Sequence, residues 1–226
     1  MTEVFLDIET IPSQQDWVRD YISEKVKPPA TIKKQESIDK WYEESYPEAV
    51  EDALSKCSFD GAMNHIICIG AAVGENDPVT FYAASIEEER ACLVGFYAWL
   101  QENTMRDDKF NAGAGNIYIG HNITGFDLKV IRQRSIVLGV IPPRGIPFDA
   151  KPWDKNPFDT MMQWDGKNMA SLDKLALAFG IDGKGDIDGS MVYGLWKAAE
   201  HEKIAEYCKK DVRITRDVYH RMKLVF

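Results

Sequence analysis

The chain has 226 residues and a mass of 25.7 kDa, which suits one large domain or one domain with an insertion. Hydrophobic residues make up 45% and charged residues 28%, as in an ordinary soluble globular protein. With 27 Lys and Arg against 36 Asp and Glu, the formal net charge of −9 excludes a strongly basic nucleic-acid coat protein or a polybasic membrane binder. An enzyme that handles phosphates through bound cations stays compatible, because its own carboxylates add to the negative charge.

The sequence predicts neither a membrane protein nor a secreted one. Its longest apolar run, Ile66 to Val73, is too short to cross a bilayer. The first nine residues include three acidic side chains, so we expect no signal peptide there. The four cysteines form no C-x-x-C pair, and we therefore expect reduced thiols and a cytoplasmic location.

The first strand is predicted at Val4 to Ile8, and its apolar character on both faces favours a central place in a sheet. Residues 13–60 differ from the rest, because they are charged, helical in pattern and interrupted by prolines. We expect a helical insertion here, with Pro47 at a helix start. Residues 1–226 are accordingly treated as a single domain that contains the insertion.

The remaining elements alternate along the chain. Further strands are predicted from apolar runs at residues 66–73, 79–83, 117–119 and 158–162. Helices are predicted from a capping box at Ser85 and Glu88 to about Leu100, over 126–138, from Ser171 to Gly180, and over 203–224. Polar or proline-rich loops are expected at 103–115, 139–157 and 181–190. Turn residues 76–78 indicate a hairpin, so this order predicts an α/β fold with a mixed central sheet flanked by helices.

The first predicted strand carries a pair of carboxylates within its apolar sequence. Side chains alternate between the faces of a strand, so Asp7 and Glu9 share one face with Phe5. Two like charges on a buried strand are costly unless something neutralises them, and oxygen ligands at this spacing suit Mg²⁺ or Mn²⁺. The alternative is a strand end that has reached solvent.

Two further motifs carry acidic residues on later elements. Asp127 follows Gly120-His121-Asn122-Ile123-Thr124-Gly125-Phe126 and falls in the first turn of a predicted helix. Tyr207 and Asp211 stand four residues apart in the last helix and so share one face beside its apolar stripe. Each has an ordinary alternative: a plain helix-start Asp in the first case, and a surface Asp paired with Lys210 or Arg213 in the second.

In this order, D-x-E, HN-x-x-x-FD and Y-x-x-x-D resemble the three motifs of the DEDD 3′–5′ exonucleases, which have an RNase H-like (DnaQ-like) fold. One branch of these enzymes places His five residues before the last Asp, where this chain has Glu206. The other branch places Tyr four residues before it, where this chain has Tyr207. The chain therefore resembles the tyrosine branch.

A more specific resemblance is to predicted 3′–5′ exonucleases related to the proofreading domain of B-family DNA polymerases. The segments of this chain that are equivalent to segments of those proteins are residues 7–12, 67–70, 183–184, 188–190 and 207–208. The resemblance is weakest over residues 13–60 and 74–115.

The resemblance implies two Mg²⁺ or Mn²⁺ ions per active site. It implies that Asp7 bridges both ions, that Glu9 and Asp211 complete the site that activates water, and that Asp127 serves the second ion. Tyr207 is expected to orient the attacking water, and Thr10 to meet the terminal 3′ hydroxyl. Further candidate substrate contacts are Asn122, Phe126 and Lys184.

The expected activity is stepwise hydrolysis of DNA from its 3′ end, with single strands preferred and nucleoside 5′-monophosphates released. An RNA 3′ exonuclease of the same mechanism is an alternative, because the motifs do not read the 2′ hydroxyl. A catalytically inert module that binds a partner protein is another. The basic window from Lys25 to Lys34 is expected to help bind substrate, whereas Trp41 and Tyr42 are expected to pack against the body of the protein. Pathway partners in replication, repair or defence are all compatible with the sequence.

Overall fold

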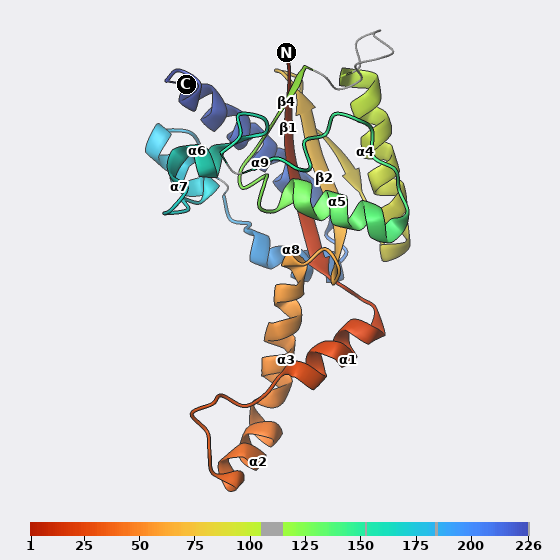
Figure 1. Cartoon of the computed structure of the whole chain (residues 1–226), viewed down its shortest axis with the longest axis vertical. Coiled ribbons are helices and arrows are strands. Elements are labelled where there is room, and N and C mark those ends of the chain that lie inside the picture. Colours follow the sequence, from red (N-terminus) through yellow and green to blue (C-terminus); the bar gives the residue numbers. More distant parts are fainter. Residues whose placement is uncertain (105–114, 152, 184, 226) are drawn as a thin grey trace.

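The computed structural model describes residues 1–104, 115–151, 153–183 and 185–225, which form a mixed sheet with helices on both faces (Figure 1). Within these residues the strand order is β3-β2-β1-β4-β5. The strands are β1 (Thr2–Pro12), β2 (Asn64–Val73), β3 (Val79–Tyr82), β4 (Asn116–Gly120) and β5 (Phe158–Asp159). The central strand β1 runs antiparallel to β2 and parallel to β4, and β2 forms the predicted hairpin with β3. The predicted mixed α/β fold is confirmed.

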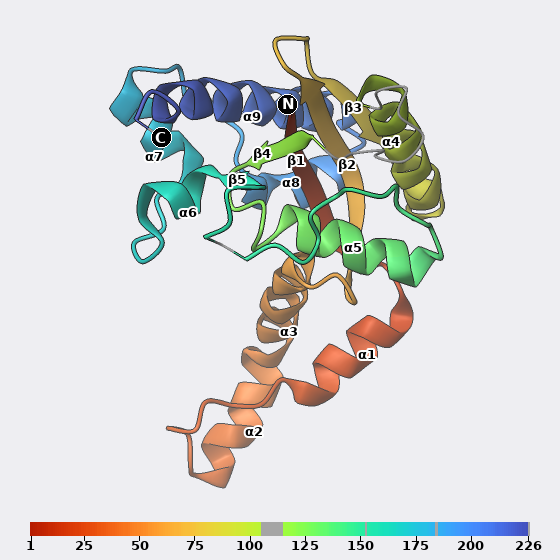
Figure 2. The same cartoon turned by 45° about the horizontal axis from the view of Figure 1, so that its top comes forward.

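Helices cover the two faces of this sheet (Figures 1 and 2). They are α4 (Glu89–Thr104), α5 (Asp127–Leu138), α6 (Thr160–Asp165), α7 (Leu172–Phe179), α8 (Val192–Lys197) and α9 (His201–Met222). Short 3₁₀ turns lie at η1 (Lys56–Phe59), η2 (Ile86–Glu88) and η3 (Gly189–Met191). None of the described helices is both long and apolar enough to cross a membrane.

The alternation of β1 assigns its side chains to two cores. Val4, Leu6 and Ile8 lie in the core beneath α4 and α5. Phe5 lies in the opposite core, which α7 and α9 cover. Because side chains alternate along a strand, the odd-numbered positions that follow Phe5 also face α9. Asp7 and Glu9 on β1 therefore face α9.

The segment between β1 and β2 is helical, as predicted, and forms α1 (Asp16–Lys25), α2 (Gln35–Glu44) and α3 (Tyr46–Ser55). It protrudes from the end of the sheet where β1 ends, with α2 farthest away (Figures 1 and 2). Pro47 stands in the first turn of α3, as expected. The rings of Trp41 and Tyr42 contact each other and Tyr46, so these aromatics pack within the protrusion rather than on the sheet.

Two predictions about local structure need correction, and one helix was not predicted. The fifth strand ends at Asp159 instead of Met162, because the Asp159 side chain accepts hydrogen bonds from the next turn and starts α6. Ser85 makes no side-chain capping bond, and Glu88 accepts instead from the Ala84 amide at 2.9 Å. Helix α8 was not predicted, since its six residues show too little periodicity. Most of the predicted loop 103–115 lies outside the described residues.

A buried ion cluster joins β2, α4 and α5. The carboxylate of Glu89 accepts from the guanidinium of Arg134 at 2.7 and 2.6 Å and from the amide of Ile66 at 2.9 Å. Its Oε2 also lies 2.9 Å from Nδ1 of His65, and Arg134 reaches the carbonyl of Gly61 at 3.2 Å. Burial raises the pKa of Glu89, but the hydrogen bonds from His65 and Arg134 outweigh it, so the net pKa lies below the ordinary 4.5. The cluster fixes α5, whose first residue is Asp127.

We predict that Glu89→Gln lowers the unfolding free energy at pH 7 by about 3–5 kcal/mol, because Arg134 stays buried without its charged partner. A carboxyl with a lowered folded pKa contributes stability above its unfolded pKa and loses it as pH falls through the folded value. The wild type should therefore lose stability below about pH 4.5 more steeply than the variant. Urea unfolding across pH measures both effects. Glu51→Gln, in an exposed pair with Arg19, is the control and should cost less than about 1 kcal/mol; a similar loss in both variants contradicts the assignment.

Candidate active site

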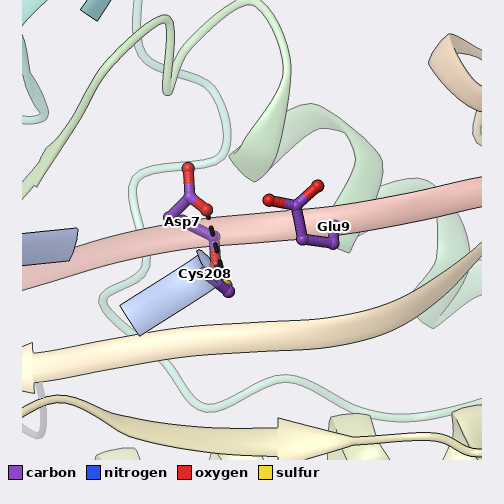
Figure 3. A group of neighbouring side chains, drawn as sticks. All are labelled: Asp7, Glu9 and Cys208. Atoms are coloured by element: carbon purple, nitrogen blue, oxygen red, sulfur yellow. Dashed lines mark hydrogen bonds between the residues drawn. The ribbon is translucent and has the colours of Figure 1, made fainter. Parts of the chain in front are cut away.

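Asp7 and Glu9 lie in the interior of β1 and on one face, as predicted (Figure 3). Their carboxylate oxygens and Sγ of Cys208 on α9 all lie within 4.8 Å of one another. Glu9 is 8% exposed, and β1 continues to Pro12. The alternative of a strand end that has reached solvent is therefore wrong, and two acidic side chains share a largely enclosed position.

Asp127 approaches the same strand from the start of α5. It is buried, and its Oδ1 accepts from the backbone amide of Ile8 at 3.0 Å. This amide is available because the pairing of β1 with β4 ends at Phe5. Burial, followed by the charges of Asp159 and Asp211, raises the pKa of Asp127 to about 7 against the lowering effect of backbone hydrogen bonds. A plain helix-start Asp would be exposed, whereas this one is directed at the central strand.

Tyr207 and Asp211 lie on the buried side of α9, 5% and 2% exposed. Burial raises the pKa of Tyr207 first, and the charges of Glu9, Asp211 and Asp7 raise it further. The phenol also hydrogen bonds to the carboxylate of Asp211, so it is a protonated donor among acidic groups. Glu206 points outward and pairs with Lys209 at 2.7 Å. The alternative of a surface Asp paired with Lys210 or Arg213 is wrong, because Asp211 is buried.

The close approach of α9 to the sheet depends on a glycine. Gly70 on β2 is the register partner of Asp7. A Cβ at this position would lie 2.8 Å from Sγ of Cys208 and 3.0 Å from Cγ2 of Val212. The absent side chain lets Cys208 approach Asp7, and its thiol lies 3.4 Å from Oδ2 of that carboxylate. Gly70 thus permits the contact that joins the α9 residues to β1.

Asp159 is a buried acidic residue near the site that the sequence reasoning missed. Its carboxylate accepts from the amides of Asn122 at 2.9 Å and Thr124 at 3.2 Å, and it also caps α6. Asn122 has a left-handed backbone with φ 60°, which makes the turn into α5. Asp159 therefore positions the loop that presents Asp127. An aspartate ahead of a helix signals a cap, but not this contact with a loop about 35 residues earlier.

Thr10 and Phe126, two of the predicted substrate contacts, are sequence neighbours of Glu9 and Asp127. Thr10 follows Glu9, and its hydroxyl donates to the carbonyl of Ser58 at 2.7 Å. Phe126 directly precedes Asp127 and is half-buried. Lys184 lies outside the described residues. The window from Lys25 to Lys34 belongs to the end of α1 and the connection to α2, in the protruding segment (Figure 1).

The donor set fits a hard divalent cation. Asp7 and Glu9 supply carboxylate oxygens within 4.8 Å of each other, and such oxygens are the ligands that Mg²⁺ and Mn²⁺ prefer. Asp127 and Asp211 are further buried carboxylates close enough to influence each other's charge. Burial raises the pKa of the Cys208 thiol, and Cys68, then Asp7 and Glu9, raise it further. Cys208 is therefore a protonated thiol that can donate to Asp7. Bound cations would also offset the repulsion among these carboxylates.

Comparisons with known proteins show which family and which fold the chain resembles. A family model described as a predicted 3′–5′ exonuclease related to the exonuclease domain of PolB matches residues 63–226. Asp127, Tyr207 and Asp211 fall within the match, whereas Asp7 and Glu9 precede it and join the site through the fold.

Among solved structures, the fold is similar to the family B DNA polymerase from the hyperthermophilic archaeon Pyrobaculum calidifontis, with a TM-score of 0.59 and 16% identity. The alignment covers 98% of this chain but only 24% of the polymerase, so the chain spans about a quarter of that protein's length. At this identity the likeness shows the fold alone. None of the curated proteins compared matches the chain.

We predict that Gly70→Ala lowers the unfolding free energy by about 1–3 kcal/mol, because the new methyl group would overlap the buried Cys208. Gly166→Ala is the matched control, since its nearest neighbour is the flexible end of Met162 at 3.3 Å. Urea unfolding compares the two variants with the wild type. Equal stability of Gly70→Ala and the wild type contradicts the close approach of α9.

Proposed function

The chain belongs to the family of predicted 3′–5′ exonucleases related to the exonuclease domain of PolB, and from this premise we propose that it is an active, metal-dependent 3′–5′ exonuclease. The observation that carries the proposal is the convergence of four carboxylates and Tyr207 from β1, α5 and α9. The proposed substrate is DNA, with unpaired 3′ ends preferred, and the products are nucleoside 5′-monophosphates.

Asp7, Glu9, Asp127 and Asp211 would hold two Mg²⁺ or Mn²⁺ ions. Such ions supply an activated water, stabilise the charge that develops on the phosphate and assist the departing 3′ oxygen. Asp7 is suited to the shared position, because its carboxylate lies within 4.8 Å of that of Glu9 and is contacted by Cys208 of α9 at 3.4 Å. Asp127 is held against β1 by the Ile8 amide, which fixes the position of its carboxylate.

Tyr207 is suited to orient a water molecule. A phenol whose pKa lies above its ordinary value of 10 does not act as a base at neutral pH. It can hold a nucleophile by a hydrogen bond, and its bond to Asp211 sets the direction of the hydroxyl. Tyr207 thus positions the water molecule and does not remove a proton from it.

Cations beside Tyr207 support a nucleic-acid substrate. Lys203 and Lys210 line a hollow of about 590 Å³ that Tyr207 also borders. Lys210 continues into a second hollow of about 700 Å³, where Arg213 and Arg221 also lie. Asp186, Glu202 and Glu206 also line the first hollow, so the cations of the second hollow are the better candidates to contact the phosphates of a bound strand.

The direct test is digestion of a 5′-labelled DNA strand with Mg²⁺ or Mn²⁺. We predict a ladder that shortens from the 3′ end, is abolished by a chelator and is slowed by a terminal 3′ phosphate. Asp7→Ala should remove nearly all activity, while the fold is kept or stabilised because like-charge repulsion falls. Asp77→Ala, an exposed residue of the hairpin turn, is the control.

Three results would count against this function. They are release of the 5′-terminal nucleotide first, full activity of Asp7→Ala, and no digestion of any strand. The last result favours the inert partner-binding module. A matched RNA strand distinguishes the two exonuclease substrates, because faster digestion of RNA makes the 2′ hydroxyl part of recognition.

Tyr207→Phe keeps the ring and removes only the hydroxyl. We predict a 10²–10⁴-fold lower kcat, about the usual range for a positioned proton-transfer group, with unchanged DNA affinity. Single-turnover cleavage at saturating Mg²⁺ measures the chemical step. Tyr97→Phe is the control, since it removes another buried hydroxyl, bonded to Ser135 at 2.7 Å, and should leave the rate unchanged. A loss below about threefold for Tyr207→Phe contradicts the assigned role.

A further inference from the structure

A groove of about 410 Å³ lies next to the carboxylates and is formed partly by the insertion. On one side it is lined by Thr10, which follows Glu9 on β1. On another it is lined by Lys56, Ser58 and Phe59 of η1, and the η3–α8 segment contributes Ser190 and Tyr193. The groove is therefore lined by the residue that directly follows a proposed metal ligand in β1.

Phe59 is unusual for its size and position, because 67% of its surface is exposed. Its segment is nonetheless well anchored. The carbonyl of Ser58 accepts from Oγ1 of Thr10 at 2.7 Å and from Nδ2 of Asn64 at 2.8 Å. These two bonds fix η1 to β1 and β2, so the ring is presented to solvent at a set position. A pre-positioned group loses little conformational entropy on binding.

A second aromatic ring extends this surface. The ring centroids of Phe59 and Phe126 lie 5.8 Å apart at an interplanar angle of 59°. Phe126 directly precedes Asp127, whereas Phe59 is linked through Ser58 to Thr10. The pair therefore spans the two backbone segments that present Glu9 and Asp127.

We propose that Phe59 is a stacking platform for a base at the unpaired 3′ end of the substrate strand, supported by Phe126. The proposal rests on the proposed exonuclease function, and it adds the residue that selects unpaired 3′ ends as the substrate. Every base has a π face, so stacking tolerates all sequences but requires a base free of its complementary strand. Lys56 lines the same groove and can neutralise a phosphate of the strand. Residues 56–59 precede the family match at 63–226, so the insertion supplies this selectivity.

The test uses a single strand that carries the fluorescent base 2-aminopurine at its 3′ terminus. Binding is measured in chelator, where no hydrolysis is expected, and cleavage is measured separately with Mg²⁺. Phe59→Ala should weaken binding roughly 5- to 100-fold and lose most of the stacking-induced quenching. Phe59→Trp should retain both, because it keeps an aromatic face. Trp17→Ala, an exposed aromatic in α1 of the same insertion, is the control and should bind like the wild type.

The outcomes separate the platform from the exonuclease function. If the wild type cleaves DNA and Phe59→Ala binds, quenches and cleaves like it, the platform is wrong while the function stands. If the wild type binds with quenching that depends on Phe59 but cleaves nothing, the platform stands and the function fails. If the wild type binds no strand, both are overturned. Unfolding curves of Phe59→Ala and the wild type should coincide, since the ring is exposed.

Discussion

Mutual repulsion among carboxylates is the constraint that the rest of this structure has to oppose. Asp7, Glu9, Asp127 and Asp211 come from three elements, and all but the half-buried Asp7 are buried. Burial, and then the charges of Asp159 and Asp211, raise the pKa of Asp127 to about 7. Burial, and then the charges of Glu9, Asp211 and Asp7, raise the pKa of Tyr207. A fold would not keep such a cluster for stability, because burial of like charges is unfavourable. Its retention favours a role that needs cations.

Contacts around the site hold the acidic elements together against this repulsion. The Glu89–Arg134 cluster fixes α5 to β2 and α4, while Asp159 fixes the loop that leads into α5. On the opposite face, Gly70 permits the close contact of α9 with the sheet. Each of these contacts holds in place an element that carries, or leads to, one of the acidic residues. The insertion then adds an aromatic surface at the edge of the same site.

Patterns that depend on one element could be predicted from the sequence. Strand alternation assigned Asp7 and Glu9 to one face, because β1 stays regular until the irregularity after Glu9. Helical spacing assigned Tyr207 and Asp211 to one face of α9. Ser171 caps the start of α7 and Gly180 caps its end, as expected. The resemblance to exonucleases then joined these separate motifs into one site.

Contacts between distant segments could not be predicted in this way. The Cys208–Asp7 contact joins residues 201 positions apart. It requires a residue without a side chain at position 70, because a Cβ there would overlap Cys208. The link from Asp159 to the 122–124 loop is likewise a tertiary contact. Phe59 lies in a segment whose charge and prolines indicated only an insertion, because nothing local shows that its end returns to β1.

The central claim is that these four carboxylates form one two-metal site. The most direct measurement is anomalous diffraction from crystals soaked in Mn²⁺. The account predicts two peaks about 3.5–4 Å apart, with Asp7 contacting both and the other carboxylates distributed between them. A peak bound through Cys208 without Asp211 and Asp127, or no peak at this position at saturating Mn²⁺, would contradict it.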